Sequence, residues 1–84
     1  ILLQVSMIYF DQSNYDLSLD YCQRAINEDN LFEDAYRQAM RNYSAMGNRP
    51  AVIHQYQRCV EVLEREINAS PSKQTNELYE SLLK

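Results

Sequence analysis

The stretch SNYDLSLDYCQRAI, residues 13–26, returns in related form as GNRPAVIHQYQRCV at residues 47–60. A shift of 34 residues aligns identical side chains in the two copies: Asn14 with Asn48, Gln23 with Gln57, and Arg24 with Arg58. Beyond these stretches, the same shift also aligns Gln4 with Gln38 and Tyr9 with Tyr43. Because the spacing is constant along the chain, the sequence predicts one structural unit that occurs twice.

Both copies carry the signals of helices joined by tight turns. Asn14 and Asn48 are typical N-cap residues, and apolar side chains follow each of them at helical spacing. Gly47 suits the left-handed position after a helix, and Pro50 falls in the first helical turn, where a missing N–H costs nothing. A helix–turn–helix unit of this length indicates the tetratricopeptide repeat.

Further signals predict the remaining helix boundaries. We expect Asn30 to cap a helix, with Glu33 completing a capping box. Asn68 should end a long helix, and Ser70 or Ser72 should cap the last one. The predicted fold is all-α: a tetratricopeptide-like right-handed helical stack of about five antiparallel helices, made of two repeats and a C-terminal helix. Small side chains should let the first two helices approach closely, namely Ser6, Ser18 and Ala25.

The first ten residues, ILLQVSMIYF, carry no charge. They are too few to cross a bilayer, which takes about 20 apolar residues, and they lack the basic start and cleavage site of a secretory signal. A helical stack normally ends in a polar face, so we expect the apolar side chains of Leu3, Met7 and Phe10 to be covered by an upstream part. The chain also lacks an initiator Met, and we expect residues 1–84 to be a single domain from a longer protein.

The composition argues against several classes of protein. The net charge is −4 and no basic stripe is visible, so direct binding to nucleic acid is not expected. Cys22 and Cys59 are far apart, which favours two reduced core thiols and a cytoplasmic protein over a single disulfide. One His and two distant Cys do not give the spacing of a zinc site.

A second pattern extends from Asp29 to Leu83. It consists of Asp29, Leu31, Glu33, Arg37, Met40, Gly47, Arg49, Tyr56, Pro71, Ser72, Thr75, Leu78 and Tyr79. This pattern resembles the bacterial transcriptional activator domain, although Asn30 and Lys73 stand where that family usually has Pro. The resemblance covers nearly the whole chain, and its C-terminal half is the specific part.

The resemblance implies a non-catalytic protein-interaction and regulatory module of a bacterial transcriptional regulator, with a winged-helix DNA-binding domain N-terminal to it. Such a module would contact its own upstream domain, the transcription machinery or a sister subunit, and would reach DNA only through the missing domain. Two alternatives remain open. One is a generic peptide-binding tetratricopeptide scaffold, and the other is a homodimerisation segment whose apolar end pairs with itself.

No residue pattern predicts catalysis, a cofactor site or a metal site. His54 is the only imidazole and stands beside apolar Ile53, and the chain has no glycine-rich phosphate loop. The acidic pair Glu33 and Asp34 falls in the first turn of a helix, where the helix dipole favours negative charge. We therefore predict that the protein is not an enzyme.

The predicted partner-binding residues are Arg37 and Arg41, together with the apolar Leu3, Met7 and Phe10. The two arginines are one helical turn apart, on the type of helix that lines the concave face of such stacks. Arg binds carboxylates through two parallel hydrogen bonds, so an acidic partner is expected. Local pairing of Arg37 with Glu33 or Asp34 is the alternative. The carboxylate clamp of chaperone-binding tetratricopeptide domains needs Lys and Asn where Leu3 and Met7 stand, so that activity is not expected. Tyr21 is predicted as an exposed contact.

Overall fold

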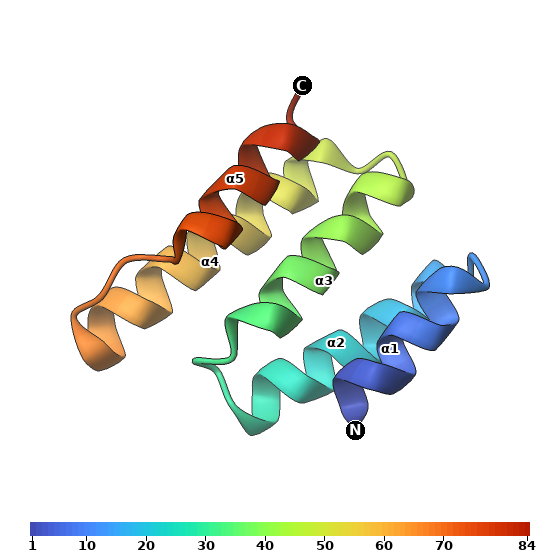
Figure 1. The fold of residues 1–84 in the computed structure, drawn as a ribbon, viewed down its shortest axis with the longest axis horizontal. Coiled ribbons are helices and arrows are strands. Elements are labelled where there is room, and N and C mark those ends of the chain that lie inside the picture. The colour runs from blue at the N-terminus through green and yellow to red at the C-terminus, as the bar shows by residue number, and fades with distance from the viewer.

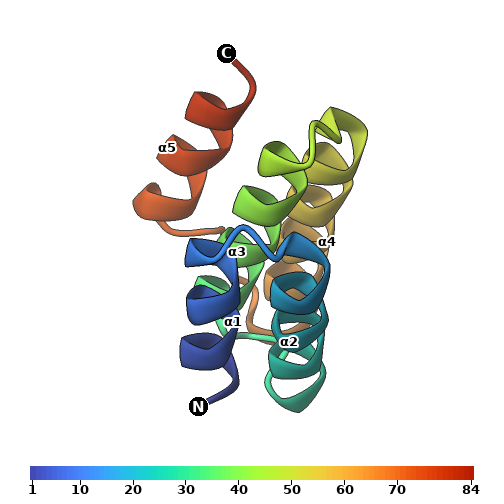
Figure 2. The same cartoon turned by 90° about the vertical axis from the view of Figure 1, so that its right-hand side faces the viewer.

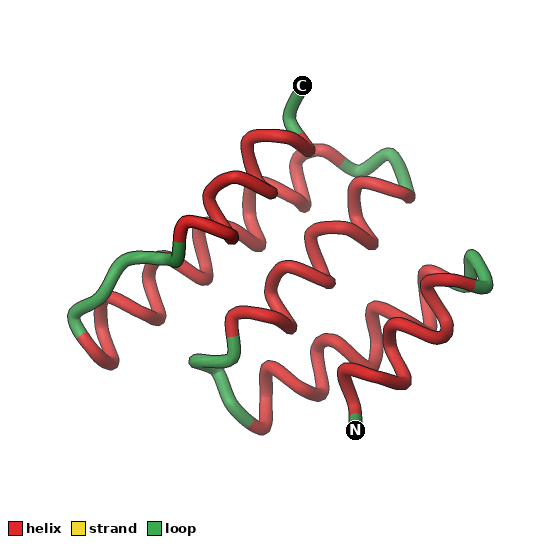
Figure 3. Tube along the Cα trace, viewed as in Figure 1, coloured by secondary structure: helices red, strands yellow, loops and turns green.

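The computed structural model describes all residues from 1 to 84. It contains five helices: α1 (Leu2–Asp11), α2 (Tyr15–Glu28), α3 (Glu33–Ala45), α4 (Arg49–Ile67) and α5 (Lys73–Leu82). Successive helices run in opposite directions (Figure 1), and short loops connect them without any strand (Figure 3). The predicted all-α, five-helix, tetratricopeptide-like stack is confirmed. None of these helices combines the length and apolar character needed to cross a membrane.

Helix α3 is the centre of the fold. It packs against each of the other four helices, whereas α1 and α5 do not contact one another. Figure 2 shows α1 and α5 on one side of the molecule and α2 and α4 on the other, with α3 between them. One face of α3 is therefore flanked by α1 and α5.

The two predicted repeats share the same turn. Ser13 and Gly47 both have left-handed backbone conformations, with φ values of 60° and 73°. The next residues, Asn14 and Asn48, each donate their N–H to the carbonyl five residues earlier at 2.8 Å. Their side chains then accept the N–H three residues later and start α2 and α4. These matching bonds at the same offset confirm the 34-residue repeat.

The apolar part of the core lies between α2, α3 and α4. It includes a cluster of six buried residues: Ala25, Ile26, Ala35, Tyr36, Cys59 and Leu63. Cys22 and Cys59 are buried free thiols, as the sequence predicts.

The core between α1, α2 and α3 is polar. The Ser6 hydroxyl donates to the Ser18 carbonyl at 2.8 Å, and the Ser18 hydroxyl donates to the Ser6 carbonyl at 2.7 Å. Asn42 Nδ2 donates to Ser18 Oγ at 2.9 Å. Reciprocal bonds of this kind need two backbones in close approach, so the role predicted for Ser6 and Ser18 is confirmed.

The start of α3 differs from the prediction. Phe32, not Asn30, is the N-cap residue, and no side chain caps this helix. Asn30 precedes the first helical residue by three positions, which is too early for its side chain to reach the free N–H groups. A turn closed by the Asp29 carboxylate, which accepts the N–H of Leu31 at 3.1 Å, occupies the space before the helix. Glu33 forms no capping box because its carboxylate is bonded to α5 instead.

The boundaries around α5 agree with the prediction. Asn68 ends α4 in the left-handed region with φ 52°, a conformation that Asn tolerates better than most residues. Of the two candidate caps, Ser72 is the one used: its Oγ accepts the N–H of Thr75 at 3.3 Å. The chain thereby reverses direction and returns α5 to α3.

Four polar residues, which we call the Glu33 cluster, hold α5 against α3. They are Glu33, Arg37, Ser72 and Thr75. One oxygen of Glu33 accepts the N–H of Ser72 at 2.9 Å and the hydroxyl of Thr75 at 2.7 Å. Arg37 donates to the same hydroxyl oxygen at 2.8 Å, and Thr75 is fully buried. Burial by itself would raise the pKa of the Glu33 carboxyl, but the hydrogen bonds from Ser72 and Thr75, with the charge of Arg37, lower it overall.

On its other side, α5 is held by aromatic packing against α4. The rings of Tyr56 and Tyr79 stack with their centroids 3.9 Å apart. The Tyr56 hydroxyl donates to Asn76 Oδ1 at 2.6 Å. The Glu33 cluster and this stack together fix the position of α5.

Exchanging the two left-handed turn residues tests the repeat. A Cβ added at Gly47 would meet no atom within 4 Å, so Gly47→Ser should destabilise the fold only through backbone strain at the positive φ. We expect Gly47→Ser to lower the free energy of unfolding by about 1 kcal/mol, and Ser13→Gly to raise it by about 0.5 kcal/mol. Urea denaturation followed by circular dichroism measures both changes. A similar decrease in the free energy of unfolding in both variants would contradict the conclusion that the two repeats share one turn.

The Glu33 cluster should make stability depend on pH. Because the pKa of Glu33 is lowered on folding, its contribution is present above about pH 4.3, the ordinary value, and is lost as the pH falls through the lowered pKa. We expect Glu33→Gln to cost about 1 kcal/mol near pH 7, a low value for charged hydrogen bonds because the carboxylate is partly exposed.

Urea titrations of wild type and Glu33→Gln between about pH 3 and pH 7 measure this effect. The two stabilities should converge as the pH falls. The control is Glu77→Gln, which removes an exposed carboxylate of α5 that lies 3.7 Å from Lys73 and should change little. A constant gap between wild type and Glu33→Gln at every pH would contradict the assignment.

Candidate protein-interaction surface

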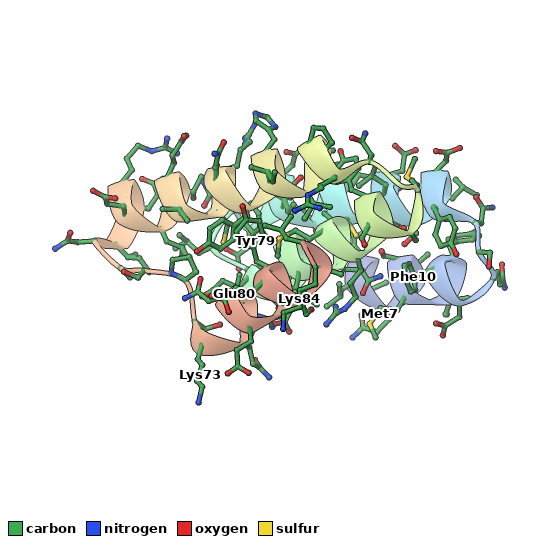
Figure 4. The ribbon with its side chains drawn as sticks, turned by 90° about the horizontal axis from the view of Figure 1, so that it is seen from above. Met7, Phe10, Lys73, Tyr79, Glu80 and Lys84 are labelled. Atoms are coloured by element: carbon green, nitrogen blue, oxygen red, sulfur yellow. The ribbon has the colours of Figure 1, made fainter.

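A groove of about 210 Å³ runs along α3 between α1 and α5. Four side chains of α3 face it because their spacing places them on one side of the helix. Its lining residues are Leu3 and Met7 of α1, Asp34, Arg37, Gln38 and Arg41 of α3, and Gln74 of α5. Figure 4 shows α1 and α5 on the same side of the molecule, with Met7 on that side.

Four of the five predicted partner-binding residues line this groove: Leu3, Met7, Arg37 and Arg41. The fifth, Phe10, is absent from the lining and packs edge-on against Tyr15, with ring centroids 5.5 Å apart. From the sequence, the apolar residues and the arginines belong to two separate surfaces. The structure instead brings Leu3 and Met7 into one groove with the arginines.

Arg37 is engaged within the domain. It pairs with Asp34, donates to Thr75, and leaves its side chain 12% exposed. Of the two local acids considered from the sequence, Asp34 is therefore the ion-pair partner. In this arrangement Arg37 supports the docking of α5 and lies beside Arg41 as a second positive charge.

Arg41 has no carboxylate within ion-pair distance. Its guanidinium is half-buried and donates to Gln38 Oε1 at 3.2 Å. Burial lowers the pKa of Arg41, the neighbouring Arg37 lowers it further, and Asp34 acts in the opposite direction. Since a guanidinium stays protonated in proteins, Arg41 presents to the groove a positive charge that forms no ion pair with an acid of the chain.

Three groove residues were not among the predicted partner-binding residues, namely Asp34, Gln38 and Gln74. Gln38 is 4% exposed, and its Nε2 has no hydrogen-bond acceptor. Helical spacing could have identified it, because it stands four residues after Asp34 and three before Arg41. No local signal could have identified Gln74, whose position depends on how α5 docks.

A second apolar feature lies on α1 away from the groove. Ile1 is 96% exposed and Ile8 is 56% exposed. Residues seven apart lie on the same side of a helix, and we call this strip the outer side of α1. The residues predicted for an uncovered apolar end were Leu3, Met7 and Phe10, and of these Met7 is also exposed, on the side of the groove.

Tyr21 is half-buried rather than free on the surface. Its ring stacks on that of Tyr9, with centroids 5.7 Å apart. The guanidinium carbon of Arg24 lies 4.9 Å from the Tyr21 ring centre, a cation–π distance. These neighbours make Tyr21 part of the packing between α1 and α2.

His54 and the two cysteines lie outside the groove. A polar cleft of about 240 Å³ between α2 and α4 is lined by His54 and Arg58 of α4 and by Tyr43 of α3. Burial raises the pKa of Cys59 to about 12 and raises that of Cys22, so both thiols stay protonated and are weak nucleophiles. No three His, Cys, Asp or Glu side chains lie close enough together to hold a metal ion.

Comparison with known proteins gives a family. The model of the bacterial transcriptional activator domain matches residues 9–83, and neither a curated protein nor a solved structure matches the chain. The matched range contains α2 to α5 and the whole Glu33 cluster. Much of the pattern that carries the sequence resemblance therefore serves to dock α5 on α3. The chain belongs to the bacterial transcriptional activator domain family.

Proposed function

We propose that this domain is a non-catalytic interaction and regulatory module of a bacterial transcriptional regulator, working in the cytoplasm beside a DNA-binding domain on its N-terminal side. Membership of the family supports the role in transcription. The net charge of −4 supports an indirect action on DNA, since phosphate binding needs a basic surface. The partner of this domain is therefore protein.

The observation that carries this proposal is the exposed outer side of α1, formed by Ile1 and Ile8. Moving one such side chain from water into an interface contributes about 1.5–3 kcal/mol. A domain joined to the N-terminal side of α1 would be close enough to cover this strip. Burying the strip in such a contact would link the position of the upstream domain to that of this domain. A regulatory module needs a contact of this kind to pass a signal between domains.

We expect Ile8→Glu in the full-length regulator to reduce reporter activation about tenfold or more, because a carboxylate cannot be buried in the apolar contact. The matched control is Leu17→Glu, which places the same charge on an exposed apolar position of α2. The control should keep activation within about twofold of wild type. Circular dichroism of both variants confirms equal folding.

Three other results would contradict the proposal. If Ile8→Glu leaves reporter activation unchanged, the outer side of α1 does not take part in regulation. A concentration-dependent dimer in sedimentation, dissociated by Ile8→Glu, would assign the strip to a second copy of the chain. A run of further 34-residue repeats upstream, in place of a winged-helix pattern, would favour a generic peptide-binding scaffold.

A further inference from the structure

The groove between α1 and α5 holds more positive than negative charge. Arg37 and Arg41 line it, and Asp34 is its one acid. Asp34 is paired with Arg37, and nearby Glu33 accepts its hydrogen bonds from α5. A half-buried cation without a counter-ion is unfavourable, so Arg41 is a position where an external anion gains stability.

The hydrogen-bond donors around Arg41 also exceed the acceptors. A guanidinium can only donate, so its bond to Gln38 fixes Oε1 on the side of Arg41. The other end of the amide, Nε2, is buried without an acceptor. Arg41 itself uses one of its five N–H groups in this bond, which leaves a pair of parallel N–H groups for a carboxylate.

The opposite wall of the groove is apolar. Leu3 and Met7 of α1 lie across from the arginines, and Met is a flexible side chain that adapts to different apolar shapes. The volume of about 210 Å³ is below the usual range of sites for whole small molecules, about 300–1,000 Å³. It suits one or two side chains of a protein segment.

We propose that the groove binds a peptide segment of another protein through a carboxylate on Arg41 and an adjacent aliphatic side chain on Leu3 and Met7. Arg37 is a positioning residue: it holds α5 through Thr75 and adds positive charge beside the site. The choice of another protein rests on the proposed function, in which the upstream domain covers the outer side of α1. Neither Ile1 nor Ile8 lines the groove, so covering them does not require the groove to be filled.

Titration of the isotope-labelled domain with an end-capped peptide, Ser-Gly-Leu-Glu-Leu-Gly-Ser, tests this proposal by nuclear magnetic resonance. We expect saturable shifts at Met7, Arg41 and the side-chain amide of Gln38, with dissociation constants on the order of 1 mM or below. The same peptide with Gln in place of Glu should bind at least about fivefold more weakly. Added salt should weaken binding of the Glu peptide only.

Substitutions at Arg41 and Arg58 distinguish specific binding of the carboxylate by Arg41 from attraction by any positive surface charge. Arg41→Gln keeps a donor for Gln38 and should reduce affinity about tenfold or more, and Arg41→Lys should reduce it less. The control is Arg58→Gln, which removes an exposed arginine from the cleft between α2 and α4 and should change nothing.

Equal binding of the Glu and Gln peptides, unchanged affinity in Arg41→Gln, or no shift up to about 5 mM peptide would each overturn the proposal. Its failure is distinguishable from failure of the proposed function, because Ile8→Glu lies outside the groove and should leave peptide binding intact. If Ile8→Glu leaves activation unchanged while Arg41→Gln abolishes peptide binding, the groove assignment stands and the outer-side contact does not.

Discussion

The carboxylate of Glu33 determines where α5 lies, and the groove depends on that position. Its bonds to Ser72 and Thr75 join the start of α5 to α3, and the Tyr56–Tyr79 stack and the Tyr56–Asn76 bond hold the same helix against α4. These bonds occupy the Glu33 carboxylate, and the other nearby acid, Asp34, is paired with Arg37. Packing α5 therefore has two effects at once: it builds one wall of the groove, and it leaves Arg41 without an internal counter-ion.

The caps formed by Asn14 and Asn48 were predictable from the sequence, and the bonds of Glu33 to residues far along the chain were not. Asn14 and Asn48 act within five positions, so their caps and the repeat followed from local chemistry. Glu33 failed as a capping box because its partners lie 39 and 42 residues further on. For the same reason the sequence placed Arg37 and Arg41 together but could not show that Thr75 engages only the first.

Helix α1 shows how a short domain can offer two contact surfaces. Ser6 faces inward and bonds to α2, and this close approach is possible because both partners are small. Leu3 and Met7 turn toward α3 and the groove, whereas Ile1 and Ile8 remain on the outer side. The apolar character of α1 is thus explained by α2 and α3 within the fold and by two proposed partners outside it.

Amide hydrogen exchange resolved by residue tests the central claim, that Glu33 ties the segment before α5 to α3. The amide of Ser72 donates to the Glu33 carboxylate, whereas the nearby Ser70 is exposed and precedes the cluster. The account predicts that the amide of Ser72 exchanges at least about tenfold more slowly than its intrinsic rate. The amide of Ser70 should exchange at close to its own intrinsic rate. Exchange of both amides at the rates of an unstructured chain would contradict it.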